Sequence, residues 1–166
     1  MTHTFENNPQ GVIGRALGLG AVAGVRSMSA PALLSRAASR GDLGGIKDTP
    51  FAFLASPRAA RILTVLAVGE ALADKLPFSP DRISPPGLVG RMASGGLVGA
   101  ALFAAAQRRA AIGAGLGLLA SAAASYPSYY LRVKTQERLG LPNWAVGLVE
   151  DALAEGGGLL ALRGQR

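Results

Sequence analysis

The sequence predicts an all-α fold, an integral membrane bundle of about five transmembrane helices. Of its 166 residues, 49% are hydrophobic and only 16% are charged, whereas soluble domains typically carry about 25% charged residues. The mean hydropathy is +0.31. Aromatic residues make up only 5%, while there are 23 glycines. Small residues in this proportion are typical of membrane helices, which associate through close backbone approach rather than through large buried side chains.

The predicted domain organisation is a polar N-terminal tail over residues 1–15 and a single transmembrane domain over residues 16–166. A bilayer is crossed by a helix of about 20 apolar residues. Segments of this kind cover approximately residues 16–35, 57–76, 87–107, 110–131 and 142–163.

Local signals place the boundaries and irregularities of these segments. Arg26 and Pro31 lie within the first segment and predict a broken or kinked helix. Ser56 followed by Pro57 predicts the start of the second helix, because serine caps helix N-termini and proline suits the first helical position. In the third segment, Gly95 and Gly99 are spaced for close contact with a neighbouring helix.

Two parts of the chain resemble each other, which predicts an internal duplication. Val65-x-x-Val68-x-Glu-Ala-Leu-Ala-Asp74 matches Val146-x-x-Val149-x-Asp-Ala-Leu-Ala-Glu155, and Ser29-x-Pro31 with Arg36 matches Ser125-x-Pro127 with Arg132. The first and second predicted helices would then be related to the fourth and fifth. Because the matching helices lie three spans apart, they would cross the membrane in opposite directions, as in the inverted repeats of many transporters.

The distribution of basic residues does not set a membrane orientation. Seven lysines and arginines fall on one side of the predicted spans and nine on the other, and the positive-inside rule requires a clear bias. The net charge of +7 is spread between the apolar segments. It therefore does not indicate a nucleic-acid footprint, which needs basic residues on one face.

Acidic residues inside predicted spans are the candidate functional residues. A charged side chain at mid-span costs roughly 2.5–3.5 kcal/mol on insertion scales, so these groups are expected to face the interior of the bundle. The acidic residues are Glu70, Asp74, Glu150, Asp151 and Glu155, and the available counter-charges are Arg26 and Lys75. The carboxylates either form a buried polar network that holds the helices together or line a path for a proton, a cation or a basic solute. Whether they bind a metal ion is left open.

Catalytic motifs are missing from the sequence. It contains no phosphate-binding loop and no zinc-protease motif, its only histidine is His3, and it has no cysteine. We therefore expect neither an enzyme nor a bound cofactor.

Three short stretches resemble a known family. The stretch Gly24-Val-Arg-Ser27 with Pro31, the run Glu70-x-x-x-Asp74-Lys75-x-Pro77 and the pair Glu150-Asp151 are similar to a family of small multi-pass bacterial membrane proteins catalogued as a domain of unknown function. The resemblance extends from about residue 18 to residue 162. It implies a multi-pass protein of the bacterial inner membrane and implies no substrate.

The function that the sequence favours is a small transporter or channel for a proton, cation or small basic solute, which moves along the intramembrane carboxylates. The alternative is a non-transporting structural or adaptor protein in which these carboxylates only pair with Arg26 and Lys75. Besides the lipid bilayer, the expected partner is a second copy of the chain, because so small a bundle often needs one to enclose a path.

Overall fold

The computed structural model describes residues 9–74, 84–139 and 143–163. Within them, the predicted all-α fold is confirmed. The elements are the helices α1 (Pro9–Val25), α2 (Ser29–Ser39), α3 (Pro57–Ala73), α4 (Pro85–Ala105), α5 (Ala110–Leu139) and α6 (Asn143–Arg163), with two 3-10 helices, η1 (Gly44–Asp48) and η2 (Ala52–Ala55), between α2 and α3.

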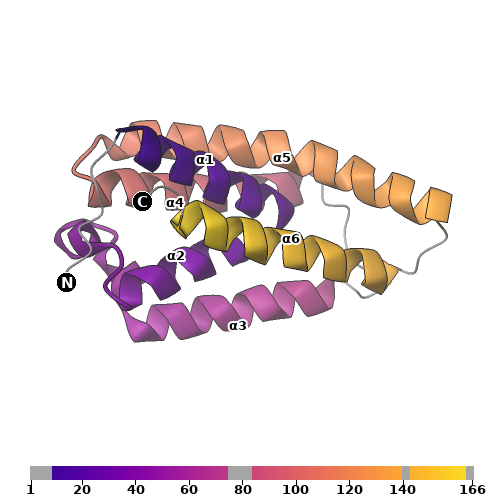
Figure 1. Cartoon of the computed structure of the whole chain (residues 1–166), viewed down its shortest axis with the longest axis horizontal. Helices are drawn as coiled ribbons and strands as arrows, with labels where there is room; N and C mark the ends of the chain where they lie inside the picture. Colours follow the sequence, from indigo (N-terminus) through magenta and orange to yellow (C-terminus); the bar gives the residue numbers. More distant parts are fainter. Residues whose placement is uncertain (1–8, 75–83, 140–142, 164–166) are drawn as a thin grey trace.

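The first predicted span, residues 16–35, is not one helix. It divides at residues 26–28 into α1 and α2, so the described residues form six α-helices where about five were predicted. Successive helices alternate in direction along the long axis of the molecule, and α2 runs back alongside α1 (Figure 1). A hydropathy pattern does not reveal such a reversal, because both arms are apolar. In addition, α1 begins at Pro9, inside the predicted tail.

Two further boundaries differ from the predictions. The connection predicted over residues 36–56 is partly helical, and Ile46 and Leu54 within it are buried. Helix α5 passes through Pro127 and continues to Leu139 instead of ending near residue 131. A proline leaves a helical carbonyl without its usual donor, and nearby hydroxyl groups often compensate. Near Pro127, Ser125 Oγ donates to the Ser121 carbonyl and Ser128 Oγ donates to the Ser125 carbonyl. The carbonyl that loses its amide donor is that of Ala123, four residues before the proline, and neither of these bonds reaches it.

The start of α3 follows its sequence signal. Ser56 Oγ accepts a hydrogen bond from the Ala59 amide at 3.1 Å, and Pro57 takes the first helical position.

Helices α1, α4 and α5 pack with their backbones in contact. A Cβ atom on Gly20 or on Gly95 would lie only 2.7 or 2.5 Å from the Gly117 carbonyl oxygen, and one on Gly99 would collide with the carbonyl of Gly113. Only glycine fits at such a contact, so the small residues that lower the hydropathy of these helices also determine how closely they pack.

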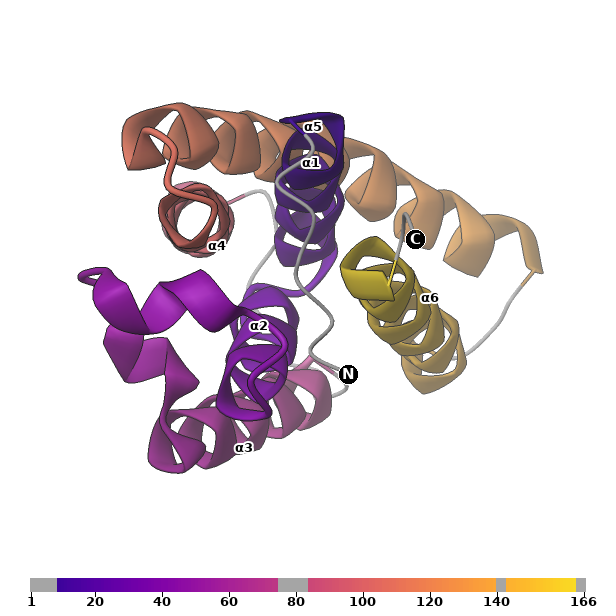
Figure 2. The same ribbon diagram turned by 60° about the vertical axis from the view of Figure 1, so that its left-hand side comes forward.

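The other helices are arranged around this group of three. Helix α2 lies between α1 and α3, and α6 lies beside α1 and α2 (Figure 2). The outer faces of α3 and α6 remain uncovered, and they carry exposed apolar side chains, namely Ile62, Val65, Leu66, Val68 and Leu72 on α3 and Leu148, Val149, Leu153, Leu159 and Leu160 on α6.

Two of the described helices, α4 and residues 110–135 of α5, are long and apolar enough to cross a membrane. The predicted spans at 16–35, 57–76 and 142–163 are not among them. Helices α1 and α3 have 17 residues each and α2 has 11. Helix α6 is longer but carries Glu150, Asp151 and Glu155 in its apolar sequence.

Candidate functional site: a charge cluster at a helix break

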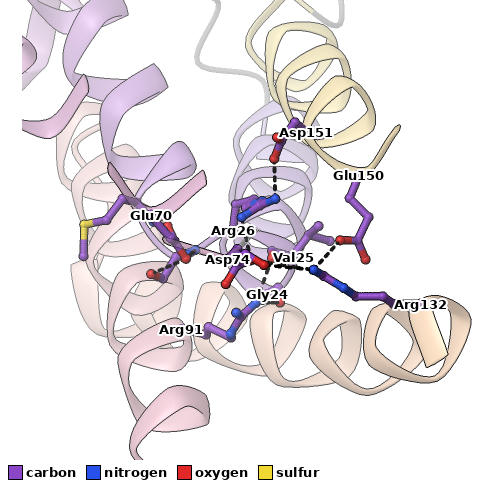
Figure 3. A network of polar contacts seen from close by, with 11 residues as sticks. Gly24, Val25, Arg26, Glu70, Asp74, Arg91, Arg132, Glu150 and Asp151 are labelled. Carbon is purple, nitrogen blue, oxygen red and sulfur yellow. Dashed lines mark hydrogen bonds and ion pairs between the residues drawn. The ribbon is translucent and has the colours of Figure 1, made fainter. Parts of the chain in front are cut away.

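The break between α1 and α2 places Arg26 at the centre of a charge cluster. Arg26 follows the last residue of α1 and is only 1% exposed. Its Nη1 atom lies 2.6 Å from Asp74 Oδ2, at the C-terminal end of α3, and its Nη2 atom lies 2.5 Å from Asp151 Oδ1 on α6 (Figure 3). One buried guanidinium therefore joins two helices that run in opposite directions.

Glu70 of α3 binds the N-terminus of α2. Its Oε1 atom accepts hydrogen bonds from the backbone amide and the hydroxyl of Ser27, both at 2.9 Å, and its Oε2 atom accepts one from the Met28 amide at 2.8 Å. The first amides of a helix have no partner inside the helix, and the helix dipole favours negative charge there. The carboxylate thus satisfies donors that the break exposes.

Arg91 of α4 binds the other side of the break, the C-terminus of α1. It is 5% exposed, and its Nη1 atom donates to the carbonyls of Gly24 and Val25, each at 2.7 Å. Ser125 Oγ of α5 lies 3.1 Å from the same Gly24 carbonyl. A positive charge is favourable at this end of a helix dipole. The carbonyls freed by the break are therefore paired as well.

A third arginine extends the cluster to α5. Arg132, 9% exposed, pairs through Nη1 with Glu150 Oε2 at 3.1 Å and donates through Nη2 to the Asp74 carbonyl at 3.1 Å. The described cluster thus contains three arginines (Arg26, Arg91, Arg132) and four carboxylates (Glu70, Asp74, Glu150, Asp151). Such buried charges require partners, because an unpaired one in an apolar interior is strongly unfavourable.

A cavity adjoins the cluster between α2, α3 and α6. It measures about 260 Å³ and is lined by Ser29, Ala32, Leu33, Arg36, Thr64, Ala67, Val68, Ala71, Asp151 and Glu155. Asp151 therefore belongs both to the ion pair with Arg26 and to the cavity wall. Glu155 is half-buried, and among the described residues it makes no hydrogen bond or ion pair.

The structure brings together most of the residues predicted from the sequence. Four of the five candidate acids join the cluster, and Glu155 lies one turn further along α6 in the cavity wall. Arg26 is the central counter-charge, whereas Lys75 lies outside the described residues. Gly95 and Gly99 lie at the contact between α4 and α5. In the described part of the chain, no group of three or more His, Cys, Asp or Glu residues is placed to hold a metal ion.

Sequence reasoning missed the roles of Arg91 and Arg132. Arg91 lies near the start of the predicted span 87–107 and Arg132 lies just past the end of the span 110–131, but both are buried within helices. The proposed duplication gave no signal for Arg132, because the residue that it aligns with, Arg36, is exposed. For Arg91, a signal was present in the sequence. The paired prolines at 85 and 86 predict the start of a helix, and Arg91 follows them inside that helix rather than in the loop.

Comparison with known proteins identifies the family but no characterised relative. No curated protein and no solved structure matches the chain. The sequence model of a domain of unknown function, DUF4126, matches residues 13–163. The family's name specifies neither an activity nor a location. Because the match covers most of the chain, the protein belongs to the DUF4126 family.

Proposed function

We propose that the protein is a small bacterial inner-membrane transporter that moves a proton or a small cation between two inverted three-helix halves. The observation that carries the proposal is the position of Arg26. This buried guanidinium joins Asp74 on α3 to Asp151 on α6. Its pair with Asp151 connects the proposed halves, and the longer pair of Arg132 on α5 with Asp74 is a second such connection.

A membrane location is supported by the surface of the molecule. Soluble monomers rarely expose contiguous apolar patches larger than a few hundred Å². Here α3 and α6 expose large aliphatic side chains along their outer faces, and α5 adds Ile112, Leu119, Tyr126, Tyr130 and Leu131. Lipid would cover these side chains, while the charged residues gather inside, as expected for ionisable groups in a bilayer.

An inverted repeat is supported by the helix directions. In Figure 1 each helix of the first three runs opposite to its counterpart three places later, so α2 opposes α5 and α3 opposes α6. These are the helices that carry the matching sequences around Ser29 and Ser125, and around Glu70 and Asp151. Because the first predicted span divides into α1 and α2 at residues 26–28, the proposed repeat relates α1–α3 to α4–α6. The sequence had predicted a repeat of the first two helices in the fourth and fifth. In transporters with inverted repeats, the site lies where the halves meet.

The break between α1 and α2 supports transport for a further reason. Non-helical backbone at membrane depth, such as a re-entrant turn between two helices, occurs where protein groups bind it or where it lines a water-filled cavity. Here the two ends of the break are bound by Glu70 and Arg91 from other helices. A cation that reaches Asp151 competes with Arg26 for this carboxylate. Weakening that ion pair frees α6 to move relative to α3.

A second candidate is a structural or adaptor membrane protein. It is favoured by Glu70, whose two oxygens are both occupied by donors at the start of α2. It is also favoured by the pairing of Glu150 with Arg132. In this case the whole cluster serves to stabilise the helix break, and no ion moves.

A liposome flux assay separates the two candidates. The purified chain is reconstituted, and the internal pH and the uptake of Na⁺, K⁺ and methylammonium are followed after a gradient is imposed. We expect flux of at least one of these ions and a decrease of at least tenfold for Asp151→Asn. Asp42→Asn, which changes an exposed acid outside the cluster, is the matched control and should transport normally.

Absence of flux for all four ions would favour the structural role. Equal flux in the Asp151→Asn and control proteins would remove the Arg26–Asp151 pair from the mechanism. Thermal unfolding of each variant in detergent shows that the comparison is made between folded proteins.

A further inference from the structure

We infer that the cavity between α2, α3 and α6 is a binding site for a small primary alkylammonium ion, held by Glu155 and Asp151. The inference deepens the proposed transport function by naming a class of substrate. It is carried by the juxtaposition of an unpaired carboxylate, a shared carboxylate and an apolar wall around one cavity.

Glu155 is the acid of α6 that has no ion-pair or hydrogen-bond partner among the described residues. It is half-buried in the cavity wall, and no other described residue bonds or pairs with it. Arg36, which lines the same cavity, makes no ion pair within the described residues. An unpaired acidic side chain in a bilayer-embedded helix is unfavourable, so a bound cation would stabilise it.

The acceptors of the cavity suit an ammonium group. A primary ammonium has three N–H donors and no acceptor. Carboxylates from Asp151 and Glu155 line the cavity, and so does Thr64, whose hydroxyl proton is already donated to the Ala60 carbonyl at 2.7 Å. The hydroxyl oxygen of Thr64 therefore remains available as an acceptor.

The rest of the wall suits a short apolar body. Leu33, Ala67, Val68 and Ala71 line the cavity. Its volume of about 260 Å³ is below the roughly 300–1,000 Å³ of pockets for drug-sized ligands. Arg36 adds one positive charge to the wall and thereby disfavours a dication. A monocation with a few carbon atoms is the occupant that matches the acceptors, the size and the lining.

Binding at this cavity would act on the ion pair that joins the two halves. Asp151 forms an ion pair with Arg26 through Oδ1 and also lines the cavity. A cation near Asp151 interacts with the same carboxylate and weakens its ion pair with Arg26. Occupancy of the site would thus be coupled to the separation of α6 from α3.

Isothermal titration of the full chain in detergent with n-butylammonium chloride tests the site. We expect saturable binding, at least tenfold weaker for Glu155→Gln and unchanged for Glu137→Gln, which alters an exposed acid on α5. Ala67→Leu, which fills the cavity without removing a charge, should abolish binding. Sodium chloride and tetraethylammonium chloride, which lack N–H donors, should bind at least tenfold more weakly.

Several results would overturn the inference. The inference is wrong if the wild-type protein shows no saturable binding of butylammonium. It is also wrong if Glu155→Gln or Ala67→Leu binds butylammonium as tightly as the wild type, or if sodium binds as tightly as butylammonium. Tighter binding of 4-aminobutyrate, lost on Arg36→Gln, would show that the occupant is a zwitterion and not a monocation. Binding without flux in liposomes would refute transport and retain the site, whereas proton flux without binding would refute the site alone.

Discussion

Replacing Glu70 with glutamine tests whether this half-buried acid stabilises the helix break. Glu70 accepts three hydrogen bonds, from the Ser27 amide, the Ser27 hydroxyl and the Met28 amide, at 2.8–2.9 Å. Glutamine has nearly the same shape but no charge and only one acceptor oxygen. In Glu70→Gln, an NH₂ group therefore faces at least one of these donors.

The expected destabilisation follows from these contacts. A hydrogen bond to a charged group contributes about 1.5–3 kcal/mol and a neutral one about 0.5–1.5 kcal/mol, so the two bonds that remain each lose about 1 kcal/mol. Leaving the half-buried Met28 amide without an acceptor costs a further ~1–3 kcal/mol. The free energy of unfolding should fall by about 3–5 kcal/mol.

Two measurements check this prediction. Denaturant unfolding in detergent gives the change in stability, and hydrogen exchange reports on the amides of Ser27 and Met28, which should lose protection. Glu137→Gln makes the same chemical change at an exposed site of α5 and should stay within about 0.5 kcal/mol of wild type. If the two variants have the same stability and the same protection at residues 27 and 28, Glu70 does not cap α2.

Three other predictions concern the packing and the helix ends. Gly117→Ala would place a Cβ against the Gly95 carbonyl and should destabilise the fold by about 1–3 kcal/mol or more. The control is Gly115→Ala on the same helix, whose Cβ would meet nothing within 4 Å, so this variant should be neutral or stabilising. Equal unfolding midpoints for these two variants would contradict the close α4–α5 contact. Arg91→Met removes the arginine donor from the Gly24 and Val25 carbonyls, of which only Gly24 keeps a second donor, the Ser125 hydroxyl, and should lower the unfolding free energy by about 1–3 kcal/mol. An unchanged unfolding free energy would show that other groups satisfy both carbonyls. Ser56→Ala removes the cap of α3 and should cost about 1 kcal/mol, and the same unfolding experiment would contradict the cap if stability were unchanged.

Much of the candidate site could be predicted because membrane-like helices carry few charges. Acids in apolar stretches are unfavourable unless they are paired, so Glu70, Asp74, Glu150 and Asp151 were identifiable without coordinates. The sequence did not show which of them would be paired with which arginine. Arg26 meets Asp74 across 48 residues, and no local pattern encodes a contact between such distant positions.

The sequence alone determined that the chain is helical and where several of the helices begin. Apolar composition, glycine spacing and the Ser56-Pro57 start are short-range properties, and they predict helices whatever surrounds them. Only the tertiary structure decided that the segment with Arg26 reverses and that α5 continues past Pro127. A helix break or a helical proline is tolerated when other helices supply the missing hydrogen bonds, and Glu70 and Arg91 reach the break only after the chain has folded.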